Sequence, residues 1–252
     1  MRNLKMKIFI TGGTSGIGKA LSEIYLQNGD TVGICGGTKD FFQKSFPKPP
    51  NGLSFFELDI RDREKVKMTL KEFTDDGQLD LVICCAGIGN GGQNDLIPDF
   101  DLANRIIDIN LKGVINTFEA ALKIMVPQKG GHLVALGSIA GFFGLSEAAA
   151  YGASKAALIN FCEALAIALK HLGIHVSLIA PGFVDTPLTK ASGRKMLFLM
   201  KPECAARKIA WAIHKKKELF VFPISMKILA FFLQHMPRFI YRNLYRFAMK
   251  KR

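Results

Sequence analysis

Short apolar runs alternate with stretches of helical periodicity along most of this 252-residue chain. Apolar runs are predicted to form strands at residues 8–11, 31–35, 53–58, 79–84, 131–138, 175–180 and 219–223. Between them, apolar side chains recur at helical spacing, as at Ala20, Leu21, Ile24 and Tyr25. Strands alternating with helices need crossover connections, which are right-handed and give a parallel sheet. The pattern therefore predicts an α/β fold, a Rossmann-type doubly wound parallel sheet that binds its ligand across the strand carboxyl ends.

Local signals mark several helix boundaries. The first helix is expected to stop at Asn28-Gly29, and Asp62 is expected to be the N-cap of the helix that follows the third strand. A later helix carries one polar side chain, Asn110, inside an otherwise apolar rhythm. A long helix is predicted from about residue 148 to 172.

The chain continues past the last strand with an apolar run and a basic helix. Residues 225–237 are mostly apolar, but the run contains Lys227 and is too short for a predicted membrane span. Beyond it, basic residues recur every four positions and form one stripe: Arg238, Arg242, Arg246 and Lys250. Such a helix is typical of a membrane interface, with cations toward anionic headgroups. We therefore divide the chain into a main domain, 1–222, and a basic amphipathic helical extension, 223–252.

Other interpretations of the extension stay open. Its apolar part can pack on the main domain or on a partner subunit, leaving the arginines in solvent. A basic tail can also bind nucleic acid nonspecifically, but the chain has no recognition module, so no specific nucleic-acid binding is predicted. The preferred partner of residues 225–252 is an anionic membrane surface.

Charge and cysteine usage bear on the cellular compartment of the protein. Of the net charge of +13, residues from His214 onward contribute +9, with ten Lys or Arg against the single acid Glu218. The five cysteines are odd in number and show no metal-ligand spacing, which favours a reducing compartment and no metal site. Because the N-terminus leads straight into a strand, no secretory signal is expected. We predict a cytoplasmic protein, with possible peripheral attachment to the inner face of a membrane.

A glycine turn follows the first strand and opens the first helix. Its sequence is Gly12-Gly13-Thr14-Ser15-Gly16-Ile17-Gly18. Glycines let a backbone pass close to a pyrophosphate, and a helix N-terminus offers free N–H groups to it. The spacing Gly12-x-x-x-Gly16-x-Gly18 differs from the G-x-G-x-x-G fingerprint, so a plain glycine turn is the alternative.

The end of the second strand bears on the choice of dinucleotide. An acid there would bind the ribose hydroxyl of NAD, but the chain has Gly36-Gly37-Thr38-Lys39. Lys39, with Lys19 of the first helix, is expected to face the 2′-phosphate of NADP. NAD remains possible, because both lysines can equally be solvated surface residues.

A candidate proton-transfer pair opens the long helix. Tyr151 and Lys155 are four residues apart and so share one helix face. A neighbouring cation favours the phenolate and lowers the pKa of a tyrosine, which can then act as general acid or base. Ser138, at the end of the fifth strand, is either a turn residue or a partner of this pair.

Taken in order, these pieces resemble the short-chain dehydrogenase/reductase (SDR) family over about residues 6–222. The matching positions are Thr11, Gly12, Gly16, Gly18, Asp59, Ala86-Gly87, Asn110, Ser138, Tyr151, Lys155, Pro181-Gly182 and Thr186. The resemblance implies an NAD(P)-dependent oxidoreductase, with NADP preferred, that transfers a hydride between the nicotinamide and a carbonyl or alcohol. It also implies a homo-dimer or homo-tetramer.

The resemblance assigns roles to these residues. Tyr151 would be the acid/base, Lys155 would lower its pKa and bind the nicotinamide ribose, Ser138 would hold the substrate oxygen, and Asn110 would hold a relay water. The cofactor-binding set comprises Gly12, Thr14, Ser15, Gly16, Ile17, Gly18, Lys39, Asp59, Ile60, Ala86, Gly87, Tyr151, Lys155, Pro181, Gly182, Val184 and Thr186. One departure is Cys84-Cys85 where the family has two asparagines before Ala-Gly. Losing those amides removes hydrogen bonds that brace the turn.

The substrate is expected to be hydrophobic, such as a lipid-, sphingoid- or steroid-like ketone. This follows from an apolar segment at about residues 189–200, including Met196, Leu197 and Phe198, and from the apolar extension. One alternative is a 3-oxoacyl carrier-protein reductase. Basic residues of this chain would then bind the acidic carrier protein. The other is a non-catalytic, membrane-associated scaffold that binds the dinucleotide.

Overall fold

The predicted strands pair into one sheet in the computed structural model, which describes residues 5–75, 77–89, 99–191 and 199–250. The strands are β1 (Lys7–Thr11), β2 (Thr31–Cys35), β3 (Leu53–Phe56), β4 (Leu81–Cys84), β5 (Gly131–Leu136), β6 (Ile174–Pro181) and β7 (Leu219–Phe222). All neighbours are parallel, in the order β3-β2-β1-β4-β5-β6-β7. The predicted Rossmann-type doubly wound sheet is confirmed.

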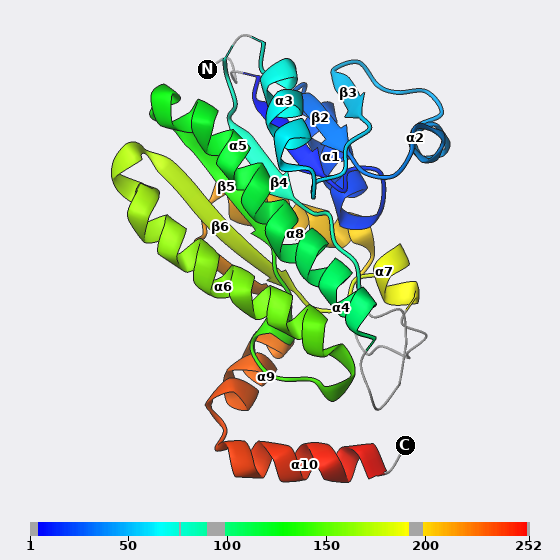
Figure 1. Cartoon of the computed structure of the whole chain (residues 1–252), viewed down its shortest axis with the longest axis vertical. Helices are drawn as coiled ribbons and strands as arrows, with labels where there is room; N and C mark the ends of the chain where they lie inside the picture. Colours follow the sequence, from blue (N-terminus) through cyan, green and yellow to red (C-terminus); the bar gives the residue numbers. More distant parts are fainter. Residues whose placement is uncertain (1–4, 76, 90–98, 192–198, 251–252) are drawn as a thin grey trace.

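Helices cover both faces of this sheet (Figure 1). They are α1 (Gly16–Gln27), α2 (Lys39–Ser45), α3 (Arg63–Phe73), α4 (Phe100–Ile107), α5 (Gly113–Gln128), α6 (Ala149–Leu169), α7 (Pro187–Lys190), α8 (Pro202–His214), α9 (Ile224–His235) and α10 (Arg238–Lys250). Because strand side chains alternate between faces, Phe9 packs with α3, α5 and α6, whereas Ile8 and Ile10 pack with α1 and α8. The two cores fix the sheet between its helix layers.

The chain order reverses between β1 and β4. Strands β2 and β3 lie on one side of β1, and strands β4, β5, β6 and β7 lie on its other side. Connections leaving the carboxyl ends of β1 and β4 therefore run in opposite directions and leave a crevice between them. This edge carries the candidate site.

Element boundaries differ from the sequence prediction where backbone groups leave the ladder. Strand β5 ends at Leu136 because Ser138 starts a 3₁₀ turn, accepting a hydrogen bond from the Ala140 N–H (3.2 Å) through its Oγ. Asp62 caps α3 as predicted, accepting from the Lys65 N–H (3.0 Å). Helix α2 was not predicted, since Lys39–Ser45 makes only two turns beside a proline-rich loop.

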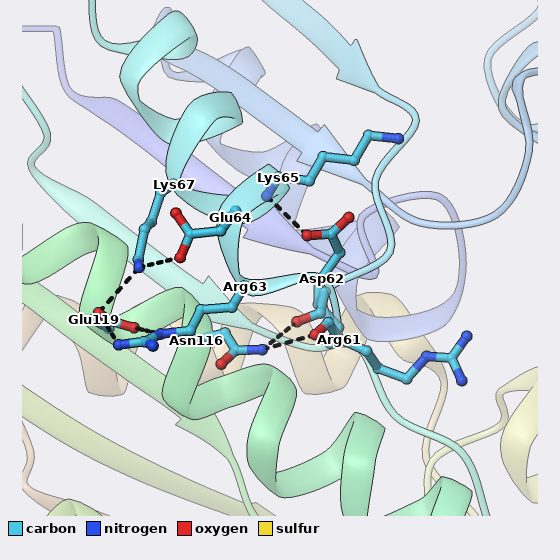
Figure 2. A network of polar contacts seen from close by, with 9 residues as sticks. Arg61, Asp62, Arg63, Glu64, Lys65, Lys67, Asn116 and Glu119 are labelled. Carbon is cyan, nitrogen blue, oxygen red and sulfur yellow. Dashed lines mark hydrogen bonds and ion pairs between the residues drawn. The ribbon is translucent and has the colours of Figure 1, made fainter.

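An ion-pair network joins α3 to α5 on the surface (Figure 2). Glu119 of α5 accepts two hydrogen bonds from the Arg63 guanidinium, at 2.6 and 2.7 Å. Lys67 bridges the same carboxylate (3.4 Å) and Glu64 (2.6 Å). Hydrogen bonds from Arg63 lower the pKa of Glu119 from its ordinary 4.5 to about 2.

We expect Glu119→Gln to lower the free energy of unfolding at neutral pH, with the deficit shrinking in acid. A carboxyl whose folded pKa is depressed stabilises the fold above its unfolded pKa and loses that contribution as pH falls through the folded value. The relevant window is therefore about pH 4.5 down to about 2. Urea unfolding at several pH values measures it, with the exposed Glu163→Gln on α6 as matched control. A deficit that does not change with pH would exclude the ionised pair as its source.

Candidate active site

A cavity of about 440 Å³ lies at the carboxyl edge of the sheet, beside the switch between β1 and β4. The sequence-predicted residues that line it are Gly12, Ser15, Gly16, Ile17, Gly18, Ala86, Gly87, Ser138, Tyr151, Lys155, Pro181, Gly182, Val184 and Thr186. They come from segments more than 170 positions apart in sequence. The fold thus gathers most of the predicted set around one space.

The glycine turn forms one wall of the cavity, at the N-terminus of α1. Gly12 has φ +67°, and a Cβ there would lie 2.7 Å from the Ala86 nitrogen. A Cβ on Gly18 would lie 2.2 Å from the Gly12 carbonyl oxygen. Ser15 holds the N-cap position, yet its side chain makes no capping hydrogen bond with the first N–H groups of α1. The turn therefore combines close backbone packing with helix N–H groups beside the cavity, as a pyrophosphate requires.

Tyr151 and Lys155 project from the first turns of α6. The Lys155 Nζ lies 5.7 Å from the centroid of the Tyr151 ring, and it donates to the Leu136 carbonyl oxygen at the end of β5 (2.8 Å). Lys155 is only 6% exposed. Burial lowers the pKa of this ammonium to about 8. The lysine is therefore held firmly in place and is easier to deprotonate than a surface lysine.

The electrostatics of Tyr151 differ from the sequence-based expectation. Burial raises the pKa of the Tyr151 phenol, and the hydrogen bond with the Ser138 hydroxyl only partly opposes the shift. The net shift is upward and Lys155 is not among its causes, so the predicted effect of Lys155 on this pKa stays a prediction. Desolvation disfavours the charged form of both groups. The Tyr151 hydroxyl is hydrogen-bonded to that of Ser138 in this buried setting.

Asn110 lies behind the cavity wall and does not line it. It is fully buried in a π-helical segment, Asp108–Lys112, between α4 and α5. Its Oδ1 accepts from the Ile88 N–H (2.9 Å), and its Nδ2 donates to the Ile88 carbonyl oxygen (2.9 Å) and to the Ser154 Oγ (3.3 Å). The side chain thus clamps the loop that follows β4. Its predicted role in a water relay stays a prediction.

This clamp also bears on the Cys84-Cys85 departure. The Cys85 N–H donates to the Thr11 carbonyl oxygen (3.1 Å), and the Ala86 N–H donates to the Thr11 Oγ1 (3.3 Å). With Asn110 at Ile88, the loop after β4 is therefore braced without asparagine side chains in it. Burial raises the pKa of the Cys85 thiol to about 12, so this cavity-lining cysteine is a weak nucleophile.

Four other predicted residues lie outside the cavity lining. The Thr14 hydroxyl donates to the Gly36 carbonyl oxygen (2.9 Å), which ties the glycine turn to the end of β2. Asp59 is paired with Arg61 (2.5 Å), and the side chain of Ile60 is buried against Gly113. Lys39 is exposed at the start of α2.

Lys19, expected beside Lys39, is directed elsewhere. Its Nζ is 3.7 Å from the Glu23 carboxylate and 5.3 Å from the Phe46 ring centroid. This leaves Lys39 as the stronger candidate for a 2′-phosphate contact.

The sequence prediction missed part of the lining. The missed residues are Cys85, Ile88, Gly89, Leu136, Gly137, Pro187, Leu188, Thr189 and Ala191. Most flank a predicted residue by one or two positions, so extending each motif past its strand end would have found them. Leu188 and Thr189 belong to α7, which Thr186 caps by accepting from the Thr189 N–H (3.4 Å). Residues Met196, Leu197 and Phe198 lie outside the described residues.

A doubly wound parallel sheet with a glycine turn at its switch point defines a dinucleotide-binding protein of the Rossmann type. The model of the short chain dehydrogenase family matches residues 6–197. The chain therefore belongs to the short-chain dehydrogenase family.

Relatives and solved structures agree with that assignment. The chain is 33% identical over 223 residues to an uncharacterized oxidoreductase of Myxococcus xanthus (strain DK1622), covering 87% of this chain and 88% of that protein. It resembles the structure of ElxO with NADP bound at 25% identity and TM-score 0.76, covering 86% and 97% of the two chains. It also resembles a 3-oxoacyl-[acyl-carrier protein] reductase from Brucella melitensis ATCC 23457, at 26% identity and TM-score 0.73, covering 86% and 89%. The protein is an oxidoreductase of this family.

Proposed function

We propose that this protein is an NADP-dependent oxidoreductase that reduces the carbonyl group of a hydrophobic substrate. The observation that carries the proposal is the convergence of the Ser138 and Tyr151 hydroxyls and the buried Lys155 on the cavity that the glycine turn borders. A substrate oxygen between the two hydroxyls would accept hydrogen bonds from both. Tyr151 would then donate its proton to that oxygen as negative charge develops there.

The residues present fit a dinucleotide. A Cβ on Gly12 or Gly18 would clash with the chain's own backbone, so these glycines allow the close turn that places the N–H groups of α1 beside the cavity. Thr186, whose side chain lies against Gly16 of the glycine turn, would hold the carboxamide, and the Lys155 ammonium would bind the ribose hydroxyls. The bound nicotinamide would supply the hydride, while the protein contributes orientation and the proton.

The lining of the cavity supports a hydrophobic substrate. Ile88, Val184 and Leu188 are among its lining residues, and more of its surface is apolar than polar. When long-chain or polycyclic ketones are added to the purified protein and NADPH, the absorbance of NADPH should fall. It should fall more slowly with short polar ketones. Equal specificity constants for polar and apolar ketones of the same size would argue against this substrate class.

A second candidate is a 3-oxoacyl carrier-protein reductase, which the likeness to the Brucella melitensis enzyme favours. A basic surface would then hold an acidic carrier. The two candidate functions are distinguished by measuring turnover of the same 3-oxoacyl chain in two forms, bound to its carrier protein and as a free thioester. A strong preference for the carrier-bound form would select this candidate.

The cofactor preference rests on Lys39. We expect Lys39→Gln to raise the KM for NADPH by about tenfold, because a charged hydrogen bond to a phosphate contributes about 1.5 kcal/mol. The KM for NADH should stay unchanged. Lys44→Gln, an exposed lysine five residues further along the same helix and with the same loss of charge, is the matched control. An equal effect of both variants, or an equal effect on both cofactors, would remove Lys39 from the phosphate site.

A further inference from the structure

The extension exposes apolar side chains on a scale seen nowhere else in the described part of the chain. Among the described residues, nineteen large apolar side chains are exposed, and nine of these nineteen lie in α9 and α10. They are Ile224, Ile228, Leu229, Phe231, Phe232, Phe239, Ile240, Leu244 and Phe247. Exposed apolar residues gathered in this number on two consecutive helices indicate a binding face.

Helix α9 shows why this surface is not simply a core face turned outward. Its Met226 and Ala230 are buried against the main domain, Met226 in a cluster with Ile139 and Ala180. At 100° per residue, Ile224, Ile228 and Phe231 fall on the opposite side of the helix. Those three are 69%, 51% and 58% exposed. The helix is therefore apolar on both sides and has covered only one of them.

Helix α10 adds charge to the extension. Arg238, Arg242 and Arg246 stand four residues apart along one exposed stripe, while Leu244 and Phe247 face another way. Glu218 is the last acid in the chain, and seven Lys or Arg follow it. No carboxylate within the extension can neutralise the stripe. This charge complements an anionic surface, with apolar side chains entering beside it.

The extension is fastened to the segment that leads into the active site. The Tyr241 hydroxyl donates to the Gly144 carbonyl oxygen, and its ring contacts that of Phe143 (6.5 Å between centroids). The Tyr245 hydroxyl accepts from the Ser146 N–H (3.3 Å). This segment joins Ser138 to Tyr151. Figure 1 shows α9 and α10, in orange and red, at the end of the molecule where α6 begins.

We propose that α9 and α10 dock the protein on an anionic lipid surface. The apolar side of α9 and the side chains of Leu244 and Phe247 enter the acyl boundary, and the arginine stripe lies against the headgroups. Among the described residues, one helix is long and apolar enough to span a membrane, Ser146–Leu172. It contains α6, which packs on the sheet and carries Tyr151, so docking rather than spanning is the mode the structure supports.

Docking has a consequence for substrate supply, and this consequence rests on the proposed function. Through Tyr241 and Tyr245, the lipid-bound helix would hold the segment before Tyr151 close to the bilayer. A ketone that partitions into the bilayer would then reach the cavity from the membrane side. A short, water-soluble ketone would need no such route.

The test is co-sedimentation of the purified full chain with vesicles of phosphatidylcholine, with and without phosphatidylglycerol. We expect binding only to the anionic vesicles. The triple variant Arg238→Gln, Arg242→Gln, Arg246→Gln should bind about 100-fold more weakly, since each cation near such a surface contributes about fivefold. The matched control removes three other exposed charges, Lys215→Gln, Lys216→Gln and Lys217→Gln, and should bind like the natural chain.

Several outcomes would overturn the proposal. Equal loss in both triple variants would indicate net charge alone, and equal binding by all would show that α10 is not the contact. A dimer that dissociates on Phe231→Ser and Phe232→Ser, without vesicle binding by the natural chain, would assign the surface to a second copy. Binding is measured without cofactor or turnover, so its failure is separate from failure of the proposed function. Turnover of a short ketone by the arginine variant tests that function independently.

Discussion

Tyr151→Phe is expected to reduce turnover of the preferred ketone by about 10²–10⁴-fold, the range typical of a lost general acid. The variant removes one oxygen atom and leaves the ring, which packs over the Lys155 ammonium. The glycine turn, 139 positions earlier in sequence at Gly12, is untouched. Affinity for NADPH should therefore change little. Steady-state kinetics with cofactor titration by nicotinamide fluorescence measures both quantities.

The control for this prediction is Tyr25→Phe, which removes the same atom from a buried tyrosine of α1 outside the cavity lining. It should leave kcat within about twofold. Turnover retained by the Tyr151 variant would mean that Tyr151 is not the proton donor. Bound NADPH with no turnover in the natural chain, across carbonyl substrates, would favour the dinucleotide-binding scaffold.

The fold was predictable because its signals are local. Each strand is a short apolar run closed by a turn, and strands alternate with helices, which already requires a parallel sheet. The ends of elements were less predictable, because tertiary hydrogen bonds set them. Ser138 lies outside strand β5 and its Oγ accepts a hydrogen bond from the Ala140 N–H. Sequence periodicity does not predict this contact.

In the site too, features marked by local sequence signals were predicted, whereas features set by tertiary contacts were not. Gly12, Ser138 and Tyr151 were found because they stand at strand ends or helix starts in a recognisable order. The burial of Tyr151, which raises the pKa of its phenol, was not predictable, because pair spacing on a helix says nothing of burial. Lys39 and Lys19 look equivalent in sequence, yet only the structure pairs Lys19 with Glu23.

Asn110 shows how a residue can be found for one reason and matter for another. Its polar character in an apolar helix singled it out. Its partners, the two backbone groups of Ile88, lie 22 positions away, across the loop that departs from the family pattern. The bracing of that loop depends on this distant side chain and on Thr11, so the cysteines at positions 84 and 85 are tolerated.

Asn110→Leu is therefore expected to destabilise the protein by about 2–5 kcal/mol, since it leaves both backbone groups of Ile88 without their partner at about 1–3 kcal/mol each. Leucine has the same number and branching of side-chain heavy atoms as asparagine, so the substitution leaves no cavity and the loss comes mainly from hydrogen bonds. The Ile88 loop would also loosen, and kcat/KM for the ketone should fall more than the Kd for NADPH rises. Urea unfolding and steady-state kinetics measure these effects.

The matched control is Asn116→Leu, one and a half turns further along the same helical stretch. Its Nδ2 donates to the Ile60 and Arg61 carbonyl oxygens (3.0 and 3.2 Å) near the surface, where water can replace it (Figure 2). That variant should lose about 1 kcal/mol or less and keep its activity, because hydrated carbonyl groups are not left unsatisfied. Similar destabilisation by both variants would show that the Ile88 clamp is an ordinary surface contact. A stable but inactive Asn110→Leu protein would instead favour the predicted water relay, because a relay can fail while the loop stays in place.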